Sequence, residues 1–330
     1  MTASGFIPYV THNERPGPRS VRHHYVPRFY LSRFADQKGR IRAFHRPTGR
    51  VFTTSAASIA AESDLYSVID RSGLVSGAVE EIISGIESRV APSLTRLAEE
   101  GWPPSLETRG LVANFIALQL TRTRESFQAM AAIYDRASKL PFEFMTLDQL
   151  RAVVVEHSED DLSAEEIDEL AEDLANTESY RVVPSKNVLV DIMLRAASEL
   201  VEPIARRRWF LERTTKRLIV TSDSPVVLWS PPGHYGVGAL NASEILLPVD
   251  SRHCLLLVAD DQGWPESIVD IPPRIARGIN RRVAGASYEW VFADPRSSVL
   301  ESMDLPVGPR PVAYFGGDPI FGESTGHRDQ

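Results

Sequence analysis

Residues 244–259 read EILLPVDSRHCLLLVA, two apolar runs separated by a short polar segment. Short runs rich in Leu, Ile and Val are typical of buried strands, so 244–249 and 253–259 are predicted as strands. Further strands are expected at 209–211, 218–220, 226–229 and 289–293. These segments predict that the later part of the chain supplies a mainly antiparallel sheet.

The middle of the chain has the periodicity of helices instead. Val79, Ile83, Ile86 and Val90 recur at the spacing of one helical face, which predicts a helix over 77–99. A long helix is expected over 106–130, where Phe115 lies in the apolar stripe. Other helices are predicted at 147–155, 164–174, 188–206 and 271–283.

The order of these elements is not a regular strand–helix alternation, which favours an α+β architecture over a doubly wound sheet. A short helix at 28–35 and a hairpin with strands 41–45 and 50–53 are expected at the start of the fold. We expect a flexible arm at 1–20, one domain over 21–321 and a loose tail at 322–330. That domain has a helical part at about 77–206 and a sheet-rich part at about 207–300.

The composition is that of a globular protein. Hydrophobic residues make up 43% of the 330 residues and charged residues 24%. Cys254 is the single cysteine, which excludes an internal disulfide and a cysteine-based zinc site. No apolar stretch approaches the ~20 residues that span a bilayer, so a cytoplasmic location without membrane contact is predicted.

Charge is unevenly distributed along the chain. The net charge is −8, yet residues 14–50 contain ten basic and two acidic residues. A second basic run lies within 206–217, whereas 156–178 contains eleven acidic residues and no Lys or Arg. The acidic run is interpreted as a solvated helix face or a mobile excursion. The basic runs either pair with this acidic region or form an anion-attracting face.

The segment His23-His24-Tyr25-Val26-Pro27 is the most unusual local feature. It precedes a predicted helix, whose free N–H groups and positive dipole end favour anions. Neighbouring side chains of an extended segment point to opposite sides, so one histidine is expected to be structural and His24 to act as acid, base or phosphate donor. The alternative is that both histidines satisfy loop carbonyls or stack against Tyr25.

Two further segments carry polar side chains in unusual places. Gln119 and Arg122 fall beside the apolar stripe of the long helix, where Arg122 either clamps a carboxylate or phosphate or pairs with Glu80 or Glu87. Asp223 lies in a short polar connection between two predicted strands. It either bonds its own backbone or serves as a catalytic carboxylate, a metal ligand or the partner that orients His24.

Several of these motifs together resemble a known family. They are His23 to Leu31 with Phe34-Ala35, Ile59-Ala60 with Tyr66, Phe115 to Gln119 with Arg122-Thr123, Thr221 to Pro225, Leu247 to Val249, and Ile279-Asn280. This pattern is similar to the family called domain of unknown function 4238, over roughly residues 21–295. The resemblance implies no activity, cofactor or substrate.

Two hypotheses about function follow. In the first, the protein binds a phosphate-bearing ligand such as RNA, DNA or a nucleotide, and His24, Arg122 and Asp223 hydrolyse it as in a nuclease or phosphodiesterase. The other ligand-binding candidates are His23, Arg28, Arg33, Gln119, Ser222 and Asn280. In the second, the chain is a non-catalytic binding or regulatory module, and these residues form a structural polar network. No dinucleotide, phosphate-loop or zinc-protease motif is present, so no cofactor is assigned and metal dependence stays open.

Overall fold

The computed structural model describes residues 22–63, 68–69, 75–99, 101–158, 160–231, 237–259, 263–303, 307–308, 311–315 and 318–321. The predicted arm at 1–20 and tail at 322–330 lie outside the described residues. The chain divides into two compact units, of which the smaller contains residues 129–185 and the larger contains residues 21–128 and 186–330. The architecture is α+β, as predicted.

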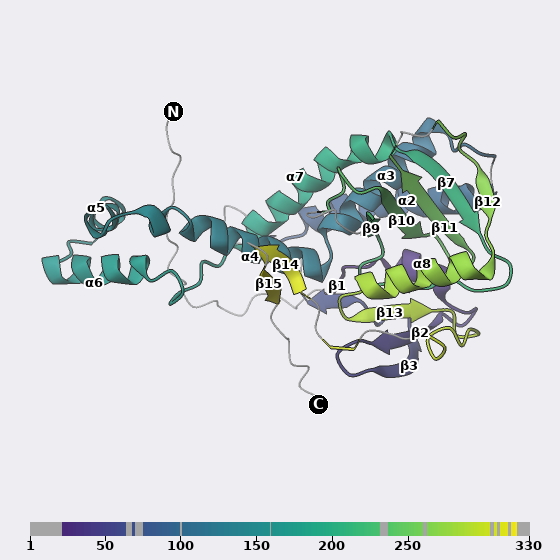
Figure 1. Ribbon diagram of the computed structural model, residues 1–330, viewed down its shortest axis with the longest axis horizontal. Helices are drawn as coiled ribbons and strands as arrows, with labels where there is room; N and C mark the ends of the chain where they lie inside the picture. The colour runs from purple at the N-terminus through teal and green to yellow at the C-terminus, as the bar shows by residue number, and fades with distance from the viewer. Residues whose placement is uncertain are drawn as a thin grey trace. The chain divides into compact units, whose positions relative to one another are not determined.

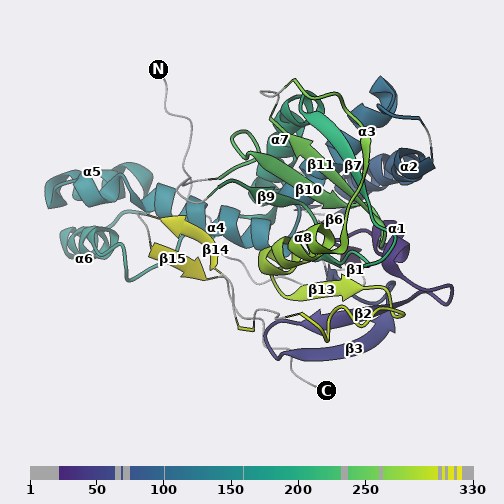
Figure 2. The ribbon, with the colours of Figure 1, turned by 45° about the vertical axis from the view of Figure 1, so that its right-hand side comes forward.

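The main sheet of the larger unit has five strands. They are β7 (Arg208–Arg213), β9 (Val227–Trp229), β10 (Glu244–Pro248), β11 (His253–Val258) and β12 (Ile268–Asp270), in the spatial order β12-β7-β11-β10-β9. Only the β12–β7 pair of this sheet is parallel. The sheet is therefore mainly antiparallel, as predicted, and Figures 1 and 2 show its strands side by side.

A second sheet of four strands belongs to the same unit. Its order is β3-β2-β13-β8, with β2 (Arg40–His45), β3 (Arg50–Ser55), β8 (Thr221–Ser222) and β13 (Trp290–Ala293). The predicted hairpin is confirmed, because β2 pairs with β3 in antiparallel register. Strands β8 and β9 belong to different sheets, so the connection that contains Asp223 leads from one sheet to the other.

The strand expected at 218–220 is absent, since these residues have no strand assignment. The side chain of Asn280 explains the difference. Its Oδ1 accepts from the Val220 N–H at 3.1 Å, and its Nδ2 donates to the Leu218 carbonyl at 2.9 Å. The Ile219 N–H donates to the Ser251 carbonyl at 2.9 Å. An amide side chain thus satisfies backbone groups that a neighbouring strand would otherwise satisfy.

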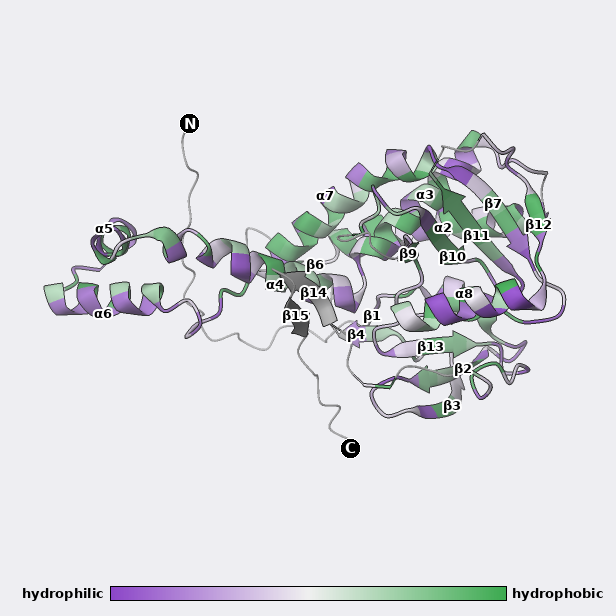
Figure 3. Cartoon of the chain, viewed as in Figure 1, coloured by the Kyte–Doolittle hydropathy of each residue, from purple (hydrophilic) through white to green (hydrophobic). Residues whose placement is uncertain are grey.

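Helices cover both faces of the five-stranded sheet. Residues of α2 (Ala78–Glu99), α3 (Leu106–Thr121) and α7 (Lys186–Ala205) share a buried cluster with alternate residues of β7 and β11, among them Trp209 and Leu255. Helix α8 (Pro273–Ala286) packs Ile279 and Val283 in a second cluster with Leu246. Figure 3 shows the hydrophobic strands β10 and β11 and the mixed polarity of α8.

The predicted long helix over 106–130 is wrong, because α3 ends at Thr121 and α4 (Arg124–Lys139) begins after Arg122 and Thr123. Arg122 has φ −105° and ψ 1°, outside the helical range. The Thr123 hydroxyl accepts from the Ser126 N–H at 3.1 Å, as an N-cap does. This cap provides the local reason for a new helix at Arg124.

The smaller unit contains α5 (Leu147–His157) and α6 (Ala164–Ala175), both predicted. Each begins with a capping box, at Thr146 and at Ser163. Leu150, Val154 and Ala171 form a small buried cluster here. The acidic segment 156–178 therefore supplies helix α6, and most of its carboxylates are exposed.

The remaining described elements are short. They are β1 (Arg22–His24), α1 (Arg28–Leu31), the 3₁₀ turns η1 (Ser32–Phe34) and η2 (Phe142–Phe144), β4 (Ala61–Ser63), β5 (Val68–Ile69), β6 (Val75–Ser76), β14 (Pro311–Phe315) and β15 (Asp318–Phe321). Elements α1 and η1 confirm the short helix expected after the histidines. In the described part of the chain, no helix combines the length and apolarity needed to cross a membrane.

Candidate functional site

The two adjacent histidines differ in environment. His23 is buried, and its Nε2 lies 3.2 Å from Oε2 of Glu80 on α2. His24 is half-buried, and its Nε2 lies 3.1 Å from the carbonyl oxygen of Ala57. Strand β1 pairs with β4, which places His23 opposite Glu62. The structure therefore gives both imidazoles contacts within the protein.

The helix that follows the histidines is anchored in the core. Tyr30 is fully buried, and its hydroxyl donates to the Pro248 carbonyl at 2.6 Å and lies 2.8 Å from Oγ1 of Thr221. Arg33 donates from Nε to the Val249 carbonyl at 2.8 Å. Arg28 is exposed. Of the two arginines predicted to bind ligand here, Arg33 ties η1 to Val249, the residue that follows β10, and Arg28 faces solvent.

Arg122 is fully buried at the break between α3 and α4. Its Nη1 donates to Oε1 of Glu87 at 2.7 Å, which is one of the two salt bridges considered from the sequence. The amide oxygen of Gln119, in the orientation that the surrounding donors require, accepts from Nε and Nη2 of Arg122 at 2.7 and 2.6 Å. The guanidinium therefore binds a carboxylate and an amide of its own chain.

Asp223 is buried and accepts hydrogen bonds from the backbone. The N–H groups of Tyr288, Glu289 and Trp290 donate to its carboxylate oxygens at 2.8, 2.6 and 3.0 Å. Burial raises the pKa of the Asp223 carboxyl to about 7, against the effect of these bonds, which favour the charged form. Asp223 thus fastens the entry of β13 to the connection between β8 and β9.

Two other predicted ligand-binding residues have local structural roles. Ser222 is buried, and its hydroxyl donates to the Ser224 carbonyl at 2.9 Å and accepts from the Ser224 N–H at 3.2 Å. Asn280 is buried and bonds Leu218 and Val220, as described above. Both side chains satisfy backbone groups of the segment that leads into and through β8.

The predicted segments converge around Arg124, which the sequence analysis did not single out. Nη1 of Arg124 donates to Oε1 of Glu289 at 2.9 Å, and its Nε lies 3.6 Å from Oε2 of Glu62. Tyr25 is buried nearby, and burial, followed by the charges of Asp223 and Glu289, raises its pKa well above the usual value. The structure therefore brings β1, β4, the α3–α4 break and the start of β13 together.

Convergence at this place involves Tyr25 rather than His24. The Nε2 of His24 lies against the Ala57 carbonyl, whereas Tyr25 lies near the charges of Asp223 and Glu289. Glu62, Glu87, Glu289 and Asp223 surround the two arginines, so carboxylates outnumber cations here. Among the residues that the structure describes, no group of three or more His, Cys, Asp and Glu is arranged to hold a metal ion.

The family model described as "Protein of unknown function (DUF4238)" matches residues 22–297, which covers most of the chain. The chain belongs to the DUF4238 family. The resemblance carried by the histidine, Arg122 and Asp223 motifs is thereby confirmed. No curated protein and no solved structure matches this DUF4238 chain.

A second group of charged residues lies on α8 of this DUF4238 protein. Arg274, Arg277 and Arg281 are exposed and fall at positions i, i+3 and i+7, on one side of the helix. Arg217 lies close to them, and burial together with the charges of Arg277 and Arg281 lowers its pKa. We call Arg217, Arg274, Arg277 and Arg281 the arginine cluster. The spacing on α8 was readable in the sequence, but the proximity of Arg217 was not.

The arginine cluster has no acidic partner within the described ranges of the chain. Nη2 of Arg217 donates to Oγ of Ser302 at 3.3 Å, and its buried Nε has no hydrogen-bond partner. Glu301 is next to Ser302, but it pairs with Arg42. Arg252, which donates to the Thr215 carbonyl at 3.1 Å, places another cation at the same turn. Positive charge is thus concentrated here, and no described acidic residue pairs with the arginine cluster.

Glu212 on β7 is a buried carboxyl outside both groups. Its Oε2 has no hydrogen-bond partner, and burial, with the nearby charge of Glu244, raises its pKa to about 7. Because the folded pKa exceeds the ordinary value of 4.5, the folded state binds the proton more tightly than the unfolded state. The stability from this group is present at low pH and is lost as the pH rises through about 7.

Replacing Glu212 with Gln is expected to remove the loss of stability that accompanies deprotonation of Glu212. The free energy of unfolding of Glu212→Gln, relative to the wild type, should rise by about 2 kcal/mol between mildly acidic and mildly alkaline pH. Urea unfolding at a series of pH values measures the difference. Glu202→Gln, which removes an exposed carboxylate of α7, is the matched control and should follow the wild-type pH dependence. A pH-independent difference for Glu212→Gln would contradict the raised pKa.

Proposed function

We propose that this protein binds a phosphate-bearing anion at the arginine cluster, and that the network around Arg122 and Asp223 is the framework that holds the fold. The observation that carries the proposal is the contrast between the two groups. Arg122 and Asp223 are buried and bonded to their own chain. Arg274, Arg277 and Arg281 of α8 are exposed and lack acidic partners among the described residues, whereas Arg282 of the same helix pairs with Glu244.

The chemistry of arginine supports a phosphate over a simple monovalent anion. A guanidinium has a planar fork of donors that matches the oxygens of a phosphate group. Arg277 and Arg281 are one helical turn apart, so two such forks face the same region. The guanidinium of Arg217 adds a further positive charge next to them. A polyphosphate or a sugar-phosphate backbone therefore fits this surface better than a single small ion.

The overall net charge of −8 does not oppose this binding. At physiological ionic strength, charges farther away than about 8 Å are largely screened. The local field at α8 therefore depends on Arg217 and the helix arginines rather than on distant carboxylates. The network around Arg124 is less suited to an anion, because Glu62, Glu87, Glu289 and Asp223 lie around its cations.

Binding of tripolyphosphate tests the proposal. Wild-type protein is expected to bind it in isothermal titration calorimetry, with an affinity that falls as salt rises. The double variant Arg277→Gln/Arg281→Gln should lose about tenfold or more in affinity, because two charge-assisted contacts are removed. The melting temperature of this variant should not fall, because the substitutions remove repulsion between like charges. The matched control, Arg195→Gln/Arg206→Gln, removes an exposed arginine of α7 and another directly after its end, and should bind as the wild type does.

Binding without hydrolysis is the expected result. Release of phosphate from tripolyphosphate and cleavage of a short oligonucleotide are measured in the same samples, with and without divalent metal. Cleavage that disappears in His24→Ala with an unchanged melting temperature would instead support a phosphodiesterase that uses His24, Arg122 and Asp223. If Arg195→Gln/Arg206→Gln lost as much tripolyphosphate affinity as Arg277→Gln/Arg281→Gln, the assignment of the binding site to α8 would be overturned.

A further inference from the structure

The five-stranded sheet has a hollow on the face that α8 covers only in part. Arg208, Val258, Glu244 and Trp229 are consecutive cross-strand partners in β7, β11, β10 and β9, so their side chains share this face. They line a cavity of about 320 Å³ together with Phe210, Pro231, Ser243, Ala259 and Trp264. Four strands at ~4.8 Å spacing make this hollow roughly 14 Å wide.

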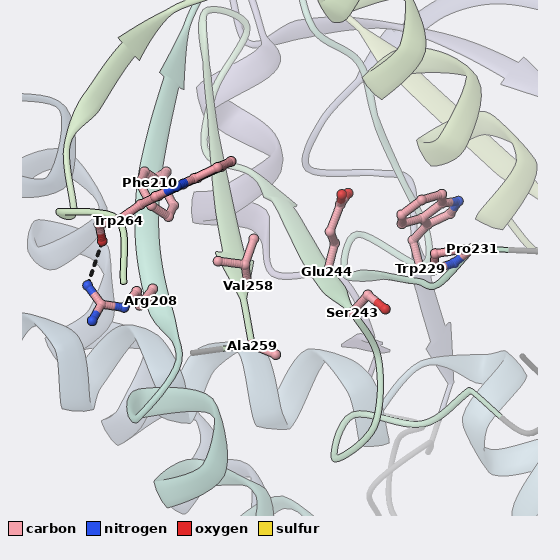
Figure 4. Close-up of a pocket in the computed structure, with 9 residues that line it drawn as sticks. All are labelled: Arg208, Phe210, Trp229, Pro231, Ser243, Glu244, Val258, Ala259 and Trp264. Carbon is pink, nitrogen blue, oxygen red and sulfur yellow. Dashed lines mark hydrogen bonds between the residues drawn. The ribbon is translucent and has the colours of Figure 1, made fainter. Parts of the chain in front are cut away.

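Aromatic rings stand at both ends of the hollow. Figure 4 shows Phe210 and Trp264 together on the β7 side, and Trp229 with Pro231 on the β9 side, with Val258 and Glu244 between them. Trp264 is 64% exposed, although most large apolar side chains of this sheet are buried. The Arg208 guanidinium donates to the Trp264 carbonyl, which positions the loop that carries this indole. The hollow thus has an exposed indole, Trp264, at one end and a half-exposed indole, Trp229, at the other.

The ring on the β9 side is fixed by α8. The guanidinium carbon of Arg282 lies 4.1 Å from the centroid of the Trp229 ring, and the same guanidinium pairs with Glu244. The preceding residue, Arg281, belongs to the arginine cluster. Successive residues of a helix point about 100° apart. Helix α8 therefore presents Arg282 to the hollow and Arg281 to the arginine cluster. The hollow and the cluster therefore border the same helix.

We infer that the phosphate-bearing ligand is a single-stranded nucleic acid whose bases stack on Trp229 and Trp264 while its backbone contacts the arginine cluster. This inference rests on the proposed function. The width of the hollow and its two separated rings favour a strand over one nucleotide. The hollow and the arginine cluster border α8, and a helix with its side chains is ~10–12 Å across. Successive nucleotides of a strand can span this distance, whereas a single phosphate cannot. Aromatic platforms beside a basic surface are the usual way of binding single strands.

The charges at the hollow are compatible with this ligand. Glu244 is neutralised by Arg282, and Arg208 adds a cation at the other end. Glu212 lies on the same face of β7, two residues from Phe210, and burial favours its neutral form. The carboxylate of Glu244 and the hydroxyl of Ser243 provide acceptors for base N–H groups. A nucleic acid strand therefore meets little negative charge at this face.

Fluorescence anisotropy with labelled strands tests the inference. Oligothymidine and oligouridine are compared with an abasic strand of equal length, which keeps the phosphates and lacks the bases. The wild type is expected to bind the base-bearing strands about tenfold more tightly than the abasic strand. Trp229→Leu/Trp264→Leu should abolish this preference and leave tripolyphosphate affinity unchanged, whereas Trp229→Phe/Trp264→Phe should retain most of it.

The control and the alternative outcomes are distinct. Phe144→Leu removes an exposed ring of the smaller unit and should keep the preference. Equal affinity of the wild type for base-bearing and abasic strands would overturn the inference and leave phosphate binding intact. Failure to bind any strand while tripolyphosphate still binds would also overturn it. Loss of tripolyphosphate binding in Trp229→Leu/Trp264→Leu would show that the two tryptophans maintain the fold and do not stack on bases, and would also overturn the inference.

Discussion

Arg122→Met is expected to lower the free energy of unfolding by about 2–4 kcal/mol, because it leaves the half-buried carboxylate of Glu87 and the buried amide oxygen of Gln119 without their donor. Arg122 has no exposed surface, and its guanidinium bonds Glu87 and Gln119. Methionine fills much of the same space, so the main loss is electrostatic and not a cavity. Urea unfolding followed by circular dichroism measures the change.

Two further variants separate the ion pair from general effects of the substitution. Arg122→Met/Glu87→Gln should recover part of the loss, since the carboxylate that remained unpaired is then neutral. Arg195→Met removes an arginine of the exposed pair with Asp191 and should cost much less than Arg122→Met. A similarly small cost for Arg122→Met would show that the buried guanidinium is not part of the framework.

Segments with a one-sided apolar pattern could be predicted from the sequence. The helices α2 and α7, the strands β10 and β11 and the hairpin of β2 and β3 each bury one face, so their periodicity is visible along the chain. The expectation of one domain over 21–321 remains a prediction. The structure separates residues 129–185, which include the acidic helix α6, as a compact unit.

The failed predictions have different causes. The break between α3 and α4 had a local signal, because Thr123 can cap a helix and Glu125 follows in its first turn. The apolar run 218–220 had no such signal. It is bonded by Asn280, sixty positions later in the chain, so its backbone partners depend on the tertiary fold. Local propensity therefore predicted a strand at 218–220, but the Asn280 side chain of α8 bonds this backbone in place of a neighbouring strand.

The site shows the same division between local and distant information. Residue type and position singled out His24, Arg122 and Asp223 as candidates, and Glu87 was one of two partners considered for Arg122. The donors that hold Asp223 come from residues 288–290, and Arg124 gains its role from Glu62 and Glu289. These partners are brought together by the pairing of β8 with β13 and of β1 with β4, which no local pattern specifies.

Separating the framework from the binding surface explains why the motifs gather in the interior. A buried polar group is stable only when its partners are in place, so Arg122, Asp223 and Asn280 hold segments that are distant in sequence. The surface that we propose for the ligand instead uses exposed side chains of α8 and of the hollow. Changes at the framework should therefore alter stability first, and changes at Arg277, Arg281, Trp229 or Trp264 should alter binding first.

Asp223→Ala is expected to lower the free energy of unfolding by about 3–5 kcal/mol. The three backbone N–H groups of residues 288–290 would lose their acceptor, and each buried donor left unsatisfied costs about 1–3 kcal/mol before relaxation. The cavity left by the side chain adds to the loss. Asp223→Asn should fall between the wild type and Asp223→Ala, because its amide keeps one acceptor oxygen and turns a donor towards the remaining N–H groups.

Asp36→Ala is the matched control for this prediction. Asp36 also accepts from backbone N–H groups, those of Lys38 and Arg40, but it lies in a surface turn where water replaces the lost acceptor. Its substitution should therefore cost much less than Asp223→Ala. A loss at Asp223 no greater than that at Asp36 would mean that burial adds nothing to the value of these bonds. The carboxylate of Asp223 would then be available for chemistry, and the framework role would be wrong.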